Sequence, residues 1–196
     1  DSVKDAFMRM NSSAGRMQTL LIDILKYTRL KHTDQSVEKV NLNALINEIK
    51  LELAESINEK SAVINVESLP VINGVPFLLK QLFSNLIANS IKYSHPDRSP
   101  VIEISAEPQP VTHNRDNSVK YILIHVSDNG IGFKKEYAES IFNIFTRLHS
   151  IEEYKGSGVG LALCKKIMQN HNGHITAEGK PDQGSIINMY FPALEQ

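Results

Sequence analysis

Apolar residues in the first thirty positions recur at alternating spacings of three and four. The pattern predicts one long helix over residues 1–31, a stretch without proline. Its narrow apolar stripe is close to a heptad seam, so we expect the helix to pair with other helices in a bundle or a dimer. An ordinary amphipathic surface helix is the alternative. The stripe consists of Phe7, Met10, Ala14, Met17, Leu21, Ile24 and Thr28.

The chain beyond the polar run 32–36 alternates between helical and strand-like patterns. We place a linker at 33–40, and Asn41 is suited to cap the helix that follows. Asn73-Gly74 predicts a turn, and the Pro-, Asn- and Asp-rich run 108–118 a surface loop. Predicted helices cover 42–58, 76–93, 136–145 and 159–170, and predicted strands cover 62–67, 70–73, 101–106, 121–127, 174–178 and 185–191.

The order of these elements indicates the fold class. Helices separate pairs of strands along the chain, which is typical of a mixed sheet with helices packed on one face. We therefore predict an α/β fold, a two-layer sandwich preceded by a long N-terminal helix.

Composition narrows the class of protein. The 196 residues suffice for one domain and an appendage, and the net charge of −1 gives no field that would favour nucleic acid or an anionic membrane. No apolar run approaches the roughly 18 residues that cross a bilayer. The single cysteine, Cys164, excludes an internal disulfide and lies on an apolar helix face, where we expect an inert buried thiol. These features predict a cytoplasmic location. The start at Asp1 without a methionine is consistent with a piece of a longer protein, which could be anchored through a membrane sensor.

One predicted helix carries polar residues beside its apolar stripe. Asn85, Asn89 and Lys92 are spaced i, i+4 and i+7, so they share one helix face. An amide oxygen is a hard ligand suited to Mg²⁺, and an ammonium is a point charge suited to phosphate. The alternative is a helix with a solvated polar face.

A second motif, Asp128-Asn129-Gly130-Ile131-Gly132, directly follows a predicted strand. A carboxylate at a strand end can accept a hydrogen bond from an exocyclic amine such as that of adenine. The two glycines would let a flat ring approach the backbone. A plain turn is the alternative, because Asp-Asn-Gly is a strong turn signal.

A third motif, Gly156-Ser157-Gly158-Val159-Gly160, opens a predicted helix. Glycines before a helix N-terminus expose amide donors to an anion, and the helix dipole adds to the attraction. The spacing matches neither a dinucleotide-binding fold nor a phosphate-binding P-loop. A flexible connector is the alternative.

With these motifs in this order, the sequence resembles the catalytic and ATP-binding domain of sensor histidine kinases, in the GHKL superfamily. The resemblance covers about residues 40–194, and residues 16–30 are similar to the second helix of the dimerisation and phosphotransfer domain. The matching motifs are Asn85–Tyr93 for the N box, Asp128–Phe133 for the G1 box, 141–145 for the F box, Gly156–Leu161 for the G2 box and Gly184-Ser185 for a last, weaker glycine motif.

The resemblance implies a Bergerat ATP-binding fold with the cofactors ATP and Mg²⁺. Asp128 would hold the adenine amine, and Asn89 would supply an oxygen to the metal. The residues with an implied catalytic role are Asn85, Lys92 and Arg147, the last reaching the phosphates with Lys155 from a lid at about 134–157. The implied binding residues are Asn85, Asn89, Lys92, Tyr93, Asp128, Gly130, Ile131, Gly132, Arg147, Leu148, Lys155, Gly156, Ser157, Gly158, Val159, Gly160, Leu161 and Ser185.

Two sequence features refine that implication. Asn85 stands where the gyrase, mismatch-repair and chaperone ATPases and the anti-sigma kinases of this superfamily have a glutamate that activates water or a hydroxyl, so little ATP hydrolysis is expected. The family's phosphoacceptor motif, a His followed by an acidic residue, is absent. His32 precedes Thr33 and fits a solvated linker. We therefore expect the chain to bind ATP without phosphorylating itself.

The sequence thus predicts three segments: part of a dimerisation hairpin at 1–32, a linker at 33–40 and a catalytic ATP-binding domain at 41–196. The whole protein is expected to transfer the γ-phosphoryl of ATP to a histidine and then to an aspartate of a response-regulator receiver domain. It is expected to form a homodimer through the N-terminal helix. A non-catalytic ATP-binding module that signals by contact is the alternative, and a stand-alone ATPase is a third option.

Overall fold

The computed structural model describes residues 36–107, 111–112, 120–149, 153–154 and 156–193, and a set of helical positions between Phe7 and Tyr27. Within that set, Phe7, Met10, Met17 and Leu21 expose most of their surface. Tyr27, the last position of that set, is partly buried and packs against the hydrophobic core of the domain. Exposed apolar side chains are compatible with the predicted seam, and the association itself stays a prediction.

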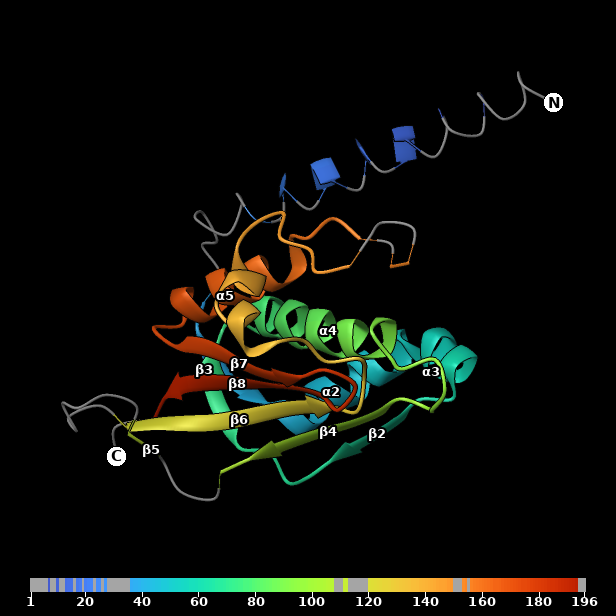
Figure 1. Cartoon of the computed structure of the whole chain (residues 1–196). Coiled ribbons are helices and arrows are strands. Elements are labelled where there is room, and N and C mark those ends of the chain that lie inside the picture. The colour runs from blue at the N-terminus through green and yellow to red at the C-terminus, as the bar shows by residue number, and fades with distance from the viewer. Residues whose placement is uncertain are drawn as a thin grey trace.

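A mixed sheet forms one layer of the domain (Figure 1). β2 and β4 are parallel, and the other neighbours are antiparallel. Ile124 and Val126 of the central strand are buried at alternate positions, so one face of the sheet borders the core. The strand order is β2 (Val63–Val66), β4 (Val101–Ala106), β6 (Lys120–Asp128), β8 (Gly184–Pro192) and β7 (His174–Lys180), with β5 (Val111–Thr112) paired to β6.

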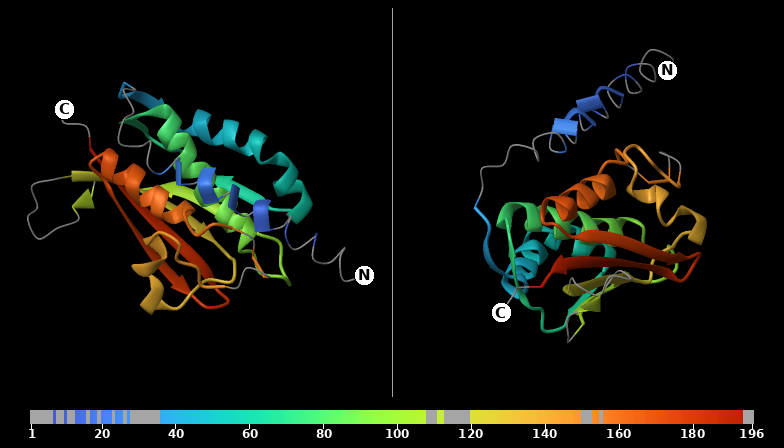
Figure 2. Two further views of the ribbon diagram at one scale, coloured as in Figure 1. Left: turned by 90° about the horizontal axis from the view of Figure 1, so that it is seen from above. Right: turned by 90° about the vertical axis from the view of Figure 1, so that its left-hand side faces the viewer.

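Helices form the other layer. α4 contacts both α2 and α5 and is the central helix, as the view from above shows (Figure 2). Its Leu79, Leu82 and Phe83 are fully buried, and Pro76 occupies the first turn, where its missing N–H costs nothing. The predicted fold class is confirmed. The helices are α2 (Leu42–Glu52), α3 (Ala54–Lys60), α4 (Pro76–Lys92) and α5 (Gly160–Asn170).

A two-stranded ribbon was not predicted. β1 (Glu38–Asn41) pairs antiparallel with β3 (Val71–Gly74), so a strand begins inside the stretch assigned to the linker. The predicted turn at Asn73-Gly74 is wrong, because Gly74 ends β3. A Cβ on Gly74 would lie 2.6 Å from Leu79 Cδ1 and 3.0 Å from the His171 ring, so this glycine permits close packing.

Two predicted helices differ from the structure. The helix over 42–58 is interrupted at Leu53, whose ψ is 9°. α2 keeps the buried stripe and the predicted cap, an Asn41 side chain that accepts a hydrogen bond from Ala44 N, whereas α3 buries no residue. The helix predicted over 136–145 is replaced by two 3₁₀ turns, η2 (Lys135–Tyr137) and η3 (Ser140–Phe142).

The reason for the second difference lies in the backbone after η3. Asn143 is extended and Phe145 has a φ of +65°, which ends any helix there. Ile141 and Phe142 are buried, and η3 packs against α5. Of the predicted loop 108–118, residues 111 and 112 form β5, and the rest lies outside the described residues.

Candidate nucleotide-binding site

Two adjoining cavities lie between α4, the end of β6 and the start of α5. One, of about 110 Å³, is lined by Asp128, Ser90 and Ser185, and the other, of about 340 Å³, by Asn85, Lys92 and the glycine-rich segment. They form one site because they share the lining residues Leu161, Ile141, Thr146, Tyr93 and Asn89. We call the first part the base end and the second the phosphate end.

Asp128 is the best-anchored side chain of the base end. Its Oδ2 accepts hydrogen bonds from Ser185 Oγ at 2.7 Å and Ser90 Oγ at 3.2 Å, and its Oδ1 accepts one from Gly130 N at 2.9 Å. Three donors from α4, β8 and the following loop therefore fix the orientation of the carboxylate. A fixed acceptor in the wall of a cavity is suited to bind an amine of a ligand.

The glycines beside Asp128 are required by the protein's own packing. A Cβ on Gly130 would lie 2.4 Å from the Tyr93 carbonyl oxygen, and one on Gly132 would lie 2.1 Å from the Lys180 carbonyl oxygen. Gly132 also has a φ of +60°, a conformation that side chains with a Cβ rarely adopt. Contact with neighbouring backbone, rather than room for a ring, explains both glycines.

The phosphate end contains the N-terminus of α5. No side chain caps this helix, and Gly158, Val159, Gly160 and Leu161 line the cavity there. The first backbone N–H groups of a helix lack intrahelical acceptors and carry partial positive charge. This end of the cavity is therefore suited to an anion.

Lys92 and Tyr93 lie at the end of α4. The Lys92 ammonium donates a hydrogen bond to Tyr93 Oη at 2.9 Å and lies 4.3 Å from the centroid of that ring. A Cβ on Gly156 would lie 2.5 Å from Lys92 Nζ, so the absence of a side chain there makes room for the lysine. The ammonium is thus held at the wall of the phosphate end.

Arg147 contacts the segment that leads to α5. Its guanidinium donates hydrogen bonds to the Tyr154 carbonyl oxygen at 2.7 Å and the Gly156 carbonyl oxygen at 3.0 Å. Tyr154 in turn lies against Tyr93, with ring centroids 5.1 Å apart. Lys155, predicted to act with Arg147, lies outside the described residues.

Asn85 and Asn89 face the same cavity from successive turns of α4. Among the described residues, Asn85 Nδ2 is a buried polar atom without a hydrogen-bond partner. Burying such an atom costs about 1–3 kcal/mol unless a ligand or water pairs with it. Its position in the cavity makes it a group that a ligand could satisfy.

The structure thus brings most of the predicted site residues to one cavity. Gly130 does not line it and instead binds Asp128, while Ile131, Gly132, Leu148 and Ser157 do line it. The roles assigned to these residues stay predictions. Lining residues to which the sequence assigned no role are Gln81, Ser84, Leu86, Ser90, Phe133, Ile141, Thr146, His149, Leu163 and Ile187.

Ser90 is the missed residue with a detectable signal. It lies four residues after Leu86 and is buried, so it interrupts the apolar face of α4 with a hydroxyl.

Cys164 plays no part in the cavity. Burial raises the pKa of its thiol, which confirms the expectation of an inert cysteine.

A family model for histidine kinase-, DNA gyrase B- and HSP90-like ATPases matches residues 74–195, which include the whole candidate site. The chain belongs to this ATPase family. Among curated proteins, it is 38% identical to the phytochrome-like protein Cph1 of Synechocystis over 98% of the chain and 24% of that protein. The chain spans about a quarter of the length of Cph1 and of the cyanobacterial phytochromes A and B of Nostoc, to which it is also similar.

Solved structures support the fold of this ATPase family. Full-length ShkA in complex with AMPPNP matches with a TM-score of 0.71 and 19% identity, over 100% of the chain and 40% of ShkA. The histidine kinase ThkA in complex with the response regulator protein TrrA matches with a TM-score of 0.70 and 21% identity, over 99% of the chain and 52% of ThkA. Among the described residues, no helix has the length and apolar character to cross a membrane.

Proposed function

We propose that the chain binds Mg-ATP and transfers its γ-phosphoryl group to a histidine of a two-component sensor kinase. The observation that carries this proposal is the Asp128 carboxylate, fixed by Ser90, Ser185 and Gly130 in a cavity that continues to the uncapped N-terminus of α5. The carboxylate at the base end is suited to an adenine amine, and the N–H groups at the phosphate end are suited to a triphosphate.

Each residue has a defined task in this proposal. Asp128 accepts a hydrogen bond from the adenine amine, and Tyr93 packs near the base. Lys92, Arg147 and the backbone N–H groups of residues 156–161 neutralise and orient the phosphates. Transfer breaks the bond between the γ-phosphorus and the β-phosphate oxygen, forms a bond to an imidazole nitrogen and leaves ADP. Such a reaction depends mainly on positioning and charge stabilisation.

The residues of the phosphate end fit a magnesium ion. Asn89 lines both cavities, and Asn85 lines one of them. Carboxamide oxygens are hard ligands, and Mg²⁺ in nucleotide sites takes its remaining ligands from phosphates and water. Among the described residues, no cluster of three or more carboxylates, cysteines and histidines offers a separate metal site. Bound there, the ion would neutralise phosphate charge.

The acceptor histidine would come from outside these 196 residues, because no histidine of the sequence stands in the acceptor context. A receiver-domain aspartate of a response regulator would take the phosphoryl group next, an assignment supported by the solved complex of ThkA with the response regulator protein TrrA. In the whole protein we propose a homodimer through segment 1–32 and a catalytic domain at 41–196, located in the cytoplasm.

Phosphoryl transfer in trans tests the proposal. The chain is incubated with Mg²⁺ and ATP labelled at the γ-phosphate, together with a separate two-helix hairpin that carries a histidine in the family's acceptor sequence. The expected product is an acid-labile phosphohistidine on the hairpin, with little free phosphate. Free phosphate without labelled hairpin would support a stand-alone ATPase. ATP binding without either product would support a contact-signalling module.

A further inference from the structure

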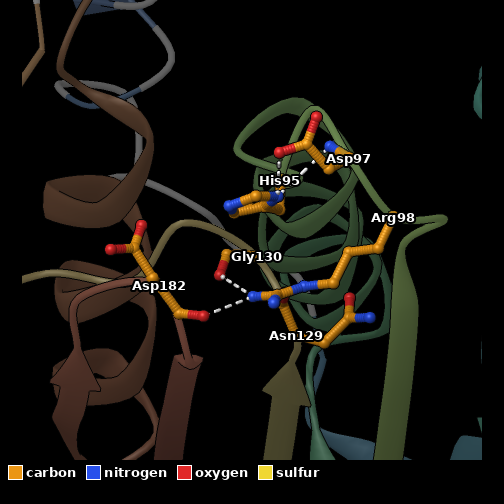
Figure 3. Close-up of polar contacts among 6 residues, drawn as sticks. All are labelled: His95, Asp97, Arg98, Asn129, Gly130 and Asp182. Atoms are coloured by element: carbon orange, nitrogen blue, oxygen red, sulfur yellow. Dashed lines mark hydrogen bonds and ion pairs between the residues drawn. The ribbon is translucent and has the colours of Figure 1, made fainter.

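Arg98 lies in the segment between α4 and β4, outside every motif of the sequence. Its guanidinium donates three hydrogen bonds to backbone carbonyl oxygens: Asn129 O from Nε at 2.7 Å, Gly130 O from Nη2 at 3.1 Å and Asp182 O from Nη2 at 2.6 Å. Figure 3 shows the Asp182 carbonyl, not its carboxylate, facing the guanidinium. One side chain therefore joins the loop after Asp128 to the turn between β7 and β8.

The convergence of these oxygens requires a cation of defined shape. Carbonyl oxygens carry partial negative charge, and three that point to one place repel each other unless a positive group lies between them. The guanidinium is planar and directs its N–H groups in a fixed fork, whereas a lysine ammonium is a compact point charge on a flexible stem. A lysine at this position could not reproduce the three bonds.

One peptide unit links Arg98 to the adenine-binding carboxylate. The carbonyl of the Asn129–Gly130 peptide accepts from Arg98 Nε at 2.7 Å, and the N–H of the same peptide donates to Asp128 Oδ1 at 2.9 Å. The peptide is planar, so fixing its oxygen also fixes the direction of its N–H. A cation on the oxygen polarises the amide and strengthens the hydrogen bond that the N–H makes.

The turn between β7 and β8, which Arg98 also contacts, positions a second hydrogen-bond donor to the Asp128 carboxylate. Asp182 N donates to the Ile131 carbonyl oxygen at 2.8 Å, and Ser185, just beyond the turn, donates to Asp128 Oδ2 at 2.7 Å. The two segments are in close contact, because a Cβ on Gly184 would lie 1.8 Å from the Asp128 carbonyl oxygen. Arg98 thus holds both segments that orient Asp128.

We propose that Arg98 is a positioning residue for base selection, acting through the Asn129–Gly130 peptide and the 180–184 turn on the Asp128 carboxylate. The inference rests on the proposed binding of ATP. Asp128 accepts a hydrogen bond from the amine of adenine and faces repulsion from the carbonyl that guanine has at the same ring position. That discrimination requires a carboxylate held in one orientation.

The test compares dissociation constants for Mg-ATP and Mg-GTP by titration calorimetry in wild type, Arg98→Ala and Arg98→Lys. Lys80→Ala is the matched control, because Lys80 is also a cation near the surface and, in the part of the chain that the structure describes, its ion-pair partners are Glu48 and Glu52 on α2. We expect Arg98→Ala to weaken ATP binding about tenfold, as loss of hydrogen bonds to a charged group would, and to change GTP binding little. The preference for ATP over GTP should fall by the same factor.

Arg98→Lys keeps the positive charge but should lose most of the preference for ATP over GTP. This variant tests the role of Arg98 even if Arg98→Ala does not fold. Protection of the Gly130 amide against hydrogen exchange, measured by NMR in the nucleotide-free protein, should fall in both variants and not in Lys80→Ala.

The role of Arg98 would be overturned if Arg98→Lys kept both the wild-type preference for ATP over GTP and the wild-type protection of the Gly130 amide against hydrogen exchange. The proposed function would still stand in that case. Absence of ATP binding by wild type would overturn the proposed function, and this inference with it.

Discussion

The two ends of the site differ in how their polar groups are paired. At the base end, both Asp128 oxygens accept hydrogen bonds from the protein, and the adjoining loop is tied to Arg98 and to the β7–β8 turn. At the phosphate end, Lys92 donates to Tyr93, and the buried Asn85 amide nitrogen has no partner among the described residues. Arg147 lines the base end and donates to two carbonyls of the segment before α5, those of Tyr154 and Gly156.

This difference indicates that the two ends of the site have different roles in binding a nucleotide. A preformed base end selects its ligand at low cost, because its groups are already oriented. The phosphate end holds the Lys92 ammonium on Tyr93, so phosphates would compete for that ammonium and satisfy Asn85. Arg147 would exchange its bonds to the Tyr154 and Gly156 carbonyl oxygens for the phosphates. We infer that the base end determines specificity and that the phosphate end assembles around the triphosphate.

The largest expected effect comes from breaking the packing of the base end with Gly132→Ala. The added Cβ would meet the Lys180 carbonyl oxygen at 2.1 Å, at a backbone φ of +60°. We expect the free energy of unfolding to fall by about 3 kcal/mol. Urea denaturation measures it, with Gly15→Ala as the control, because a Cβ on Gly15 meets nothing within 4 Å. Equal stability of the two variants would contradict the packing account.

A smaller effect is expected when the charge at the base end is removed without changing its shape. Asp128→Asn replaces one acceptor by an amide donor that faces hydroxyls and the adenine amine, so ATP affinity should fall by about a hundredfold. Calorimetry measures this. Asp97→Asn is the matched control, since Asp97 is exposed and lies outside both cavities. Unchanged ATP affinity in Asp128→Asn would show that the carboxylate does not contact the base.

The smallest effect concerns His171, which joins α5 to the start of α4 away from the cavity. Its Nε2 accepts a hydrogen bond from Val75 N at 3.0 Å and its Nδ1 lies 2.8 Å from the Ile167 carbonyl oxygen, so the neutral ring with the proton on Nδ1 fits both partners. Burial lowers the pKa of His171.

A histidine that must be neutral in the folded protein makes its full contribution to stability at pH values above its pKa in the unfolded chain, about 6.5. This contribution is lost as the pH falls below that value. We therefore expect the free energy of unfolding to decrease by about 1 kcal/mol below pH 6.5, the contribution of one hydrogen bond. Denaturation of wild type and His171→Gln at several pH values measures this. The variant keeps an acceptor that does not titrate, so an equally steep pH dependence in both proteins would exclude His171 as the cause.

The sequence predicted those parts of the fold that local patterns determine. The α4 helix follows from its apolar period and Pro76, and Asn41 caps α2 as expected. The 3₁₀ turn η3 was missed because its conformation depends on tertiary packing, the burial of Ile141 and Phe142 against α5. β1 was missed because a short strand is defined by its partner, β3, rather than by its own pattern.

The residues of the candidate site also differ in whether the sequence reveals them. Motif residues such as Asn89 and Asp128 could be found because residue type and spacing carry their chemistry. Arg98 could not, because its acceptors are backbone carbonyls 31, 32 and 84 residues away in the chain, and any residue type supplies a carbonyl.

The most direct test of the two-ended site is calorimetric titration of ATP, with Mg²⁺ and with chelator, into wild type and Asn89→Ala. We expect wild type to bind ATP in both conditions, about tenfold more tightly with Mg²⁺, and Asn89→Ala to bind in both with the affinity of wild type in chelator. Wild type that fails to bind ATP even with Mg²⁺, or an Asn89→Ala variant that keeps the full metal dependence, would contradict the account.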